Sequence, residues 1–305
     1  MSWFLIAIIT PVTGALVNHF DKYLISRFTK DSSIGALILF SSLFAIVALP
    51  IIFFINPSVL QATGLVEAII LLVNGGLLML AILFYLYALE SHEASYIAPM
   101  FELIPVFSFV LGFFILGEGL VAKQILAVML VILGSIILSL DLDGRRVKVK
   151  YKIILLMFGA SFLYAINAII FKMIAVDQSF VDSLFWDMSG KVMFGLLLFF
   201  GVKRYRRDFL ALIKNHRYYV IGLNIVNEIL GLVGMVALIF AVLFAPVVLV
   251  QTVGSLQTPL VFIFGIIITI FFPRFGKESM LFKHLTQKII GIIIVTVGVF
   301  LLELF

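Results

Sequence analysis

Long apolar stretches alternate with short polar ones along the whole chain. A helix that crosses a bilayer needs ~20 mostly apolar residues, and ten stretches approach that length. They run roughly over residues 3–24, 34–55, 66–89, 94–116, 120–140, 152–175, 183–202, 218–243, 246–272 and 285–304. The polar pieces between them are too short for a globular domain. The pattern therefore predicts an all-α, polytopic membrane protein with ten transmembrane helices.

The composition agrees with that prediction and excludes several other classes of protein. Hydrophobic residues make up 64% of the chain and charged residues 12%, against about 45–50% and about 25% in soluble domains. The chain has no cysteine, and its four histidines lie in different segments without metal-ligand spacing, so we expect no metal site and no cofactor. We interpret the formal charge of +5 as a bias between membrane sides and expect no nucleic-acid partner.

The two halves of the chain share an ordered set of matching residues. The matches are Lys22 with Lys172, Asn74 with Asn227, Ala88 with Ala241, Pro105 with Pro259, Ala127 with Gly291, and Gly134 with Gly298. Apolar segments align easily with one another, but the shared order favours a duplication. Five helices per half is an odd number, so residues 151–305 would cross the membrane upside down relative to residues 1–140. We therefore expect two inverted five-helix repeats, with the substrate site between them near the midplane.

The fourth predicted helix carries an acid between two prolines. Pro99, Glu102 and Pro105 lie within seven positions of a segment that is apolar enough for lipid. Proline frees a backbone carbonyl and bends a helix, which a membrane tolerates only where protein or a cavity satisfies the freed group. A carboxylate at membrane depth costs at least ~2.5 kcal/mol, so Glu102 should face the bundle interior. We expect Pro99 and Pro105, with their counterpart Pro259, to act as hinges.

A few other polar residues lie deep in the predicted helices and are candidates for a substrate site. They are Asn74 and Tyr85 in the third helix, Asp187 and Lys191 in the seventh, Asn227 and Glu228 in the eighth, and Gln251 and Ser255 in the ninth. Asp187 and Lys191 share a helix face, where they either neutralise each other or bind a charged group. Glu228 could pair with Lys191 on the neighbouring helix. Asn74 and Asn227 could equally be interhelical hydrogen-bonding groups.

Other charged residues near helix ends are interpreted as structural. Asp21, Lys22 and Lys172 are close enough to predicted helix ends for their side chains to reach the membrane surface. Glu118 and Lys123 flank the turn between the fourth and fifth helices, where we expect a local ion pair or a helix-end charge. None of these residues is expected to take part in transport.

The fourth and fifth predicted helices resemble a known family. They contain the run Ala98-Pro99…Pro105…Leu116-Gly117-Glu118, followed by Gln124…Ala127…Gly134, which is similar to the EamA domain of the drug/metabolite transporter superfamily. The second half carries a weaker copy, in which Phe272-Pro273 replaces the glycine-glutamate pair. The resemblance implies a ten-helix metabolite carrier. It also implies that helices one to four and six to nine line a central cavity, with the fifth and tenth outside it.

Basic residues gather in the loops after the first, fifth, seventh and ninth predicted helices. The positive-inside rule places these loops in the cytoplasm and both chain termini outside. The family resemblance implies the opposite orientation, with the termini inside. Both orientations stay open at this point, for a multi-pass protein of the plasma or inner cell membrane.

These observations predict a secondary carrier that moves a small organic metabolite by alternating access, and no enzyme. An acid and a base together suit a zwitterion such as an amino acid, with amines and sugars as alternatives. Apolar surroundings disfavour a charged carboxyl, so Glu102 or Glu228 could couple transport to protons. The expected partners are the substrate and the lipid bilayer, for a monomer or a homodimer. The alternatives are a flippase for a lipid-linked intermediate, a subunit that supports a membrane enzyme, and a membrane enzyme itself.

Overall fold

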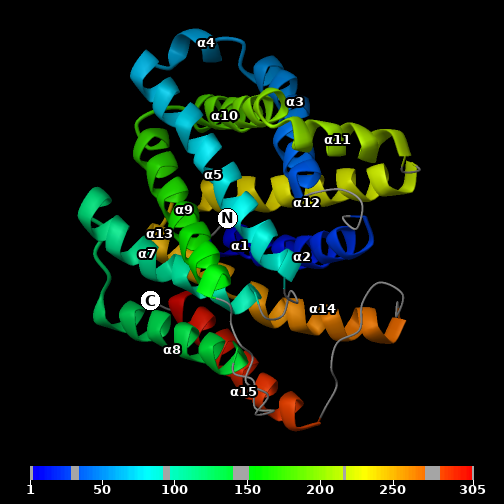
Figure 1. Ribbon diagram of the computed structural model, residues 1–305. Coiled ribbons are helices and arrows are strands. Elements are labelled where there is room, and N and C mark those ends of the chain that lie inside the picture. Colours follow the sequence, from blue (N-terminus) through cyan, green and yellow to red (C-terminus); the bar gives the residue numbers. More distant parts are fainter. Residues whose placement is uncertain are drawn as a thin grey trace.

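Helices form all the regular structure in the part of the chain that the computed structural model describes (Figure 1). That part covers residues 3–28, 34–91, 97–139, 151–215, 218–271 and 282–303. The predicted all-α class is confirmed. The longer helices are α1 (Trp3–Ala7) with α2 (Ile9–Phe28), α3 (Ile34–Ile55), α5 (Leu65–Ser91), α7 (Leu103–Leu111), α8 (Ala122–Ser139), α9 (Tyr151–Ala175), α10 (Phe180–Gly201), α11 (Lys203–Asn215), α12 (Tyr218–Ala241), α13 (Val247–Gly254), α14 (Gln257–Phe271) and α15 (Phe282–Glu303). Short helical turns are α4 (Val59–Ala62), η1 (Ala98–Glu102) and η2 (Gly112–Leu116).

Seven helices in the described ranges are long and apolar enough to cross a membrane. They are Trp3–Ile25, Ile34–Ile55, Leu65–Glu90, Tyr151–Ala175, Phe180–Gly201, Ile221–Ala241 and Val247–Phe271. The other three predicted segments contain shorter apolar helices, at Met100–Leu116, Ala122–Gly134 and Ile289–Leu302. The ends of four predictions, at residues 94–96, 140, 272 and 304, lie outside the described residues. The chain is a multi-pass membrane protein.

Prolines explain the breaks in two of the spans. Pro11 follows the junction of α1 with α2, and Pro259 follows the junction of α13 with α14. A proline ring clashes with the carbonyl four residues earlier, which belongs to Ala7 at the end of α1 and to Ser255 between α13 and α14. The regular α-helix is therefore interrupted at these two points. The second interruption lies at the cavity, which is lined there by Gln251, Ser255 and Thr258.

The fourth segment is irregular along its whole length. It begins as the 3-10 helix η1, continues as α7 and ends as the π-helix η2. Pro99 lies in η1 and Pro105 in α7, on either side of Glu102. The segment stops at Gly117, whose φ of 67° is a left-handed conformation that glycine adopts without a steric penalty.

Contacts between helices recur when the two halves of the chain are exchanged. Helix α5 packs on α9 as α12 packs on α2, and α7 packs on α9 as α14 packs on α2. Helices α8 and α15 lie side by side at one edge of the molecule (Figure 1). One pair departs from this pattern, because α5 packs closely on α10 whereas its counterpart α12 touches α3 only slightly.

Glycines allow close contact between α8 and α15. A Cβ added to Gly134 of α8 would lie 2.9 Å from the backbone nitrogen of Val295, and a Cβ on Gly298 of α15 would lie 3.1 Å from that of Val131. The same offset relates Gly134 to Gly298 and Val131 to Val295, so the two contacts mirror each other. Helices in lipid rely on such small residues for close packing. The matched glycines are therefore packing positions.

Candidate functional site

A cavity of about 280 Å³ lies at the centre of the bundle. Its walls come from α2, α3, α5, η1, α7, α9, α10, α12, α13 and α14, and no described residue of α8 or α15 lines it. The family resemblance implies this arrangement. The lining includes seven of the nine candidate site residues, namely Tyr85, Glu102, Lys191, Asn227, Glu228, Gln251 and Ser255. Asn74 and Asp187 are not part of it.

Glu102 lies where the two broken segments meet. It is the last residue of η1 and is only 6% exposed. Its carboxylate accepts hydrogen bonds from the hydroxyls of Ser255 and Thr258, the latter at 3.2 Å. Ser255 lies at the junction of α13 with α14 and Thr258 in the first turn of α14, so both hydroxyls come from the second broken segment. Both donors are neutral hydroxyls. Glu102 therefore contributes an acidic group to the cavity wall.

A second acidic region lies on the α2, α3 and α12 side of the cavity. Glu228 of α12 accepts a hydrogen bond from Ser41 of α3. The neighbouring Asn227 donates to a carboxylate oxygen of Asp21 at 2.7 Å. Asp21 is 9% exposed and lines the cavity. Its interpretation as a helix-end residue at the membrane surface was wrong, because α2 continues to Phe28 and keeps Asp21 inside the bundle.

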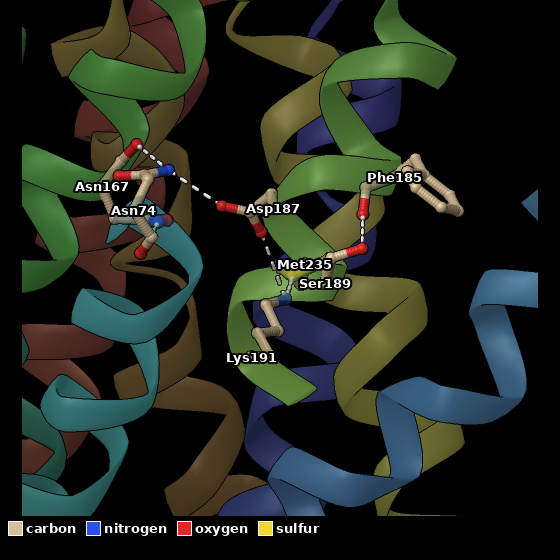
Figure 2. Close-up of polar contacts among 7 residues, drawn as sticks. All are labelled: Asn74, Asn167, Phe185, Asp187, Ser189, Lys191 and Met235. Carbon is tan, nitrogen blue, oxygen red and sulfur yellow. Dashed lines mark hydrogen bonds and ion pairs between the residues drawn. The ribbon is translucent and has the colours of Figure 1, made fainter. Parts of the chain in front are cut away.

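Lys191 is the cation of this site, and its partner lies on its own helix (Figure 2). The Lys191 ammonium is 3.6 Å from a carboxylate oxygen of Asp187 and also donates to the sulfur of Met235. The predicted intrahelical pair is therefore present. The expected partner Glu228 instead bonds to Ser41. Both members of the pair are buried, so each charge depends on the other.

Asn74 fixes the far side of Asp187, behind the cavity wall. Its amide nitrogen donates to Asp187 at 2.9 Å, and Asn74 and Asn167 exchange hydrogen bonds with each other's backbone carbonyls at 3.3 and 3.2 Å (Figure 2). Asn74 thus orients the acid that neutralises Lys191. Its counterpart Asn227 holds Asp21 in the same manner, so each of the two matched amides binds an aspartate from the other half of the chain.

Aromatic rings form the wall beside Glu102. The hydroxyl of Tyr85 donates to Asn18 at 2.5 Å, and both residues line the cavity. The ring of Phe101 lies 5.4 Å from that of Tyr85 and 5.7 Å from that of Tyr164. Sequence reasoning did not select Asn18 or Tyr164 as site residues. The sequence feature that could have identified them is that each shares a helix face with other polar residues.

Glu118 and Lys172 form a separate cluster at the end of the fourth segment. The Lys172 ammonium donates to Glu118 at 2.5 Å and to the carbonyl of Ala245 at 2.7 Å. The second oxygen of Glu118 accepts from the Val247 amide at 2.8 Å. Its position near a helix end had suggested that the Lys172 side chain reaches the membrane surface. That interpretation was wrong, because the ammonium is held by Glu118 and Ala245. The Glu118 carboxylate joins α9 and the start of α13 to the turn after η2.

Residues 1–140 match the model of the EamA-like transporter family. These residues, 140 of the 305 in the chain, are therefore similar to that family. Proteins of the EamA-like family are membrane transporters of the drug/metabolite type. No curated protein matches the sequence. A crystal structure described only as that of a protein shares 14% identity, covers 99% of this chain and 95% of its own, and has a TM-score of 0.60, a likeness that shows the fold alone.

Proposed function

We propose that this EamA-like protein is a secondary carrier of small solutes that bear an ammonium group, and that the central cavity binds them. The charge of the lining carries this proposal. Asp21, Glu102 and Glu228 provide three carboxyls, whereas Lys191 is the only lysine or arginine among the described lining residues. Lys191 already has Asp187 as a partner behind the wall. The cavity therefore favours a cation or the positive end of a zwitterion.

The size and shape of the cavity suit a small solute. Its volume of about 280 Å³ is near the lower limit for ligand pockets, which is about 300 Å³. An ammonium group at Glu102 would meet a carboxylate that already accepts from Ser255 and Thr258. The carboxylate of an amino acid could then reach Lys191, whose 3.6 Å distance to Asp187 leaves room for a closer partner. Amino acids and small amines are therefore our proposed substrate class.

In the proposed mechanism, residues 1–140 and residues 151–305 form two inverted five-helix repeats. The recurrence of helix contacts under exchange of the halves supports this arrangement. In such carriers, the opposite-facing state arises when the halves exchange conformations. The close contact of α5 with α10 and the loose contact of α12 with α3 then mark the closed and the open end of the cavity. In the alternate state, α12 packs on α3 and α5 separates from α10.

The prolines and carboxyls have assigned roles in this cycle. Pro105 and Pro259 are buried next to the breaks that bring Glu102 and Ser255 together, and with Pro99 they permit bending as the halves move. Glu102 and Glu228 exchange a proton for the substrate ammonium, which couples transport to protons. The carrier works in the plasma or inner cell membrane, as a monomer or a homodimer.

The alternative of a flippase has less support. A lipid-linked substrate requires a groove rich in apolar bulk, and the described lining contains only two phenylalanines, Phe44 and Phe101. Three buried or half-buried carboxyls line the cavity, where contact with acyl chains would be unfavourable. We therefore do not assign the protein to lipid-linked intermediates or to the support of a membrane enzyme.

Transport in liposomes tests this proposal. Purified protein is reconstituted, loaded with an unlabelled solute, and assayed for counterflow of the radiolabelled form. Panels of amino acids, small amines, sugars and dicarboxylates are compared with protein-free vesicles, and a fluorescent-lipid translocation assay is run in parallel. We expect counterflow of an amino acid or amine. Counterflow only of sugars or dicarboxylates, or lipid translocation without solute counterflow, would overturn the proposed substrate class.

A further inference from the structure

Helix α11 (Lys203–Asn215) is too polar to span a membrane and lies at the edge of the molecule beside α3 (Figure 1). It starts directly after Val202. That residue has an extended backbone conformation, with φ −112° and ψ 92°, and α10 ends there. Its sequence, KRYRRDFLALIKN, places five basic residues and one acid in 13 positions. The proposed transport cycle gives these charges no role, so they need a separate explanation.

The side chains of α11 divide among three directions. Leu212 is 1% exposed and Asp208 is 7% exposed, so this side faces the protein. Leu210 and Ile213 are 51% and 43% exposed, and their spacing of three places them on one apolar strip. Lys203, Arg204, Arg207 and Lys214 are exposed on the remaining side. A helix with an exposed apolar strip beside an exposed basic one is typical of the membrane interface.

The arginines are positioned for an anionic ligand. Asp208 lies 3.8 Å from Arg204 and 3.2 Å from Arg207, yet the two arginine side chains remain 73% and 77% exposed. One carboxylate therefore orients two guanidinium groups and leaves most of their donors for another partner. Arg206 lies four residues before Leu210, at the edge of the apolar strip, where its guanidinium can extend to the headgroup region. Guanidinium groups bind phosphate oxygens in paired hydrogen bonds.

Contacts of Tyr205 link this surface to the cavity helices. The Tyr205 ring covers Gly35 at the start of α3, where an added Cβ would lie 2.0 Å from a ring carbon. The Tyr205 hydroxyl is 2.5 Å from that of Tyr87 in α5. Because α3 and α5 both line the cavity, a ligand that fixes α11 would restrain two of the helices that surround the site.

We propose that α11 lies in the membrane interface and binds the headgroups of anionic phospholipids. Leu210 and Ile213 enter the acyl boundary, and the exposed lysines and arginines contact phosphate groups. The charges of the two partners are complementary, since α11 carries a net positive charge and anionic lipids attract basic segments next to a membrane. This assignment is independent of the substrate and stands even if the solute proves to be of another class.

Fluorescence quenching by spin-labelled lipids tests the proposal. The chain has no cysteine, so Leu210→Cys can carry a single bimane label in the full-length protein. Two sets of phosphatidylcholine vesicles are compared. One contains phosphatidylglycerol with a spin label close to the headgroup, and the other contains the same amount of phosphatidylcholine with that label. We expect stronger quenching by the phosphatidylglycerol label. The excess should fall as sodium chloride is added, because exposed charges are screened.

Two controls separate lipid recognition from general exposure to the bilayer. A label at Phe114→Cys, a 79% exposed position on η2 away from α11, should be quenched equally by both lipids. The variant K203Q/R206Q/K214Q removes three of the five basic residues and keeps the two arginines that pair with Asp208, so it should lose a clear part of the excess quenching but not all of it. Equal quenching by both lipids at Leu210, or none by either, would overturn the proposal. If the variant does not fold, the salt titration of the parent protein decides.

Discussion

Gly75 of α5 lies against the backbone carbonyl of Asp187 in α10, so closely that an added Cβ would be 1.9 Å from that oxygen. On the facing helix, a Cβ on Gly190 would be 2.0 Å from the carbonyl of Leu72. The two glycines allow the backbones of α5 and α10 to touch. This contact is the closed end of the cavity in our mechanism, and it lies directly beside the Asp187–Lys191 pair.

The first prediction concerns this contact. Gly75→Ala should lower the stability by about 1–3 kcal/mol, because the backbone carbonyl opposite cannot move aside. Gly76→Ala is the matched control, since its Cβ would meet only the Phe194 ring at 3.9 Å. Thermal unfolding in detergent measures both. Equal midpoints for the two variants would show that the close contact of α5 with α10 is absent from the protein in solution.

The second prediction concerns Glu102. Glu102→Gln keeps the size of the side chain but removes its charge, so it should reduce substrate affinity roughly ten- to hundredfold, the range expected for one hydrogen bond to a charged group. Glu90→Gln, an exposed position at the end of α5, should leave affinity unchanged. Counterflow measured across a pH series gives the second readout. Glu102→Gln with the parent rate and the parent pH profile would remove Glu102 from both binding and proton coupling.

The third prediction separates the structural and functional roles of Lys191. Asp187→Asn and Lys191→Met each leave one buried charge unpaired, so each should cost several kcal/mol of stability, on the order of 3–5. The double variant D187N/K191M should recover much of that stability, as measured by thermal unfolding. Transport should stay low in the double variant if Lys191 binds the substrate. Full transport by a stable double variant would make the pair purely structural.

The fourth prediction concerns the Glu118–Lys172 contact. Lys172→Met removes the ammonium that donates to Glu118 and leaves that carboxylate with the Val247 amide, so we expect a loss of stability of roughly 1–3 kcal/mol, typical of a polar group that loses its partner. Lys152→Met, an exposed lysine at the start of α9, is the control. A double-mutant cycle with Glu118→Gln should show coupling between the two residues. Strict additivity of the two single changes would mean that no ion pair forms.

The helices of this protein were largely predictable because apolar length is a direct physical requirement of the bilayer. The predicted segment 34–55 coincides with α3, and the break before Pro259 follows from the geometry of proline. The shorter helices of the fourth segment were less predictable, because the mixture of 3-10, α and π turns depends on which tertiary contacts satisfy the freed carbonyls.

The acids of the site were only partly predictable. Glu102 and Glu228 stand out because a carboxyl at membrane depth is costly, and both line the cavity. Asp21 was missed because the apolar pattern ends the first helix near residue 24, whereas α2 continues to Phe28. Asn74 was predicted to be a site residue, but it lies behind the cavity wall. Its helix is apolar on all sides, so the hydrophobic pattern does not indicate which face points toward the cavity.

The partners of these residues could not be read from the sequence. Glu118 pairs with Lys172 across 54 positions, and Asn227 pairs with Asp21 across 206. Such contacts depend on which helices become neighbours, and hydrophobic periodicity carries no information about that. The duplication is the one sequence feature that bears on these partners, because a contact made by one half predicts the corresponding contact in the other half.

Access of water to one shared cavity is the central claim. Gly231 lines the cavity and has no atom within 4 Å of an added Cβ, so Gly231→Cys should place a thiol in open space without a clash. Val226→Cys on the same helix, 46% exposed on the outer surface, is the control. The account predicts that a cationic, water-soluble methanethiosulfonate labels Gly231→Cys but not Val226→Cys, and that a transported amine slows the labelling. No labelling of Gly231→Cys, or labelling that no transported solute slows, would contradict it.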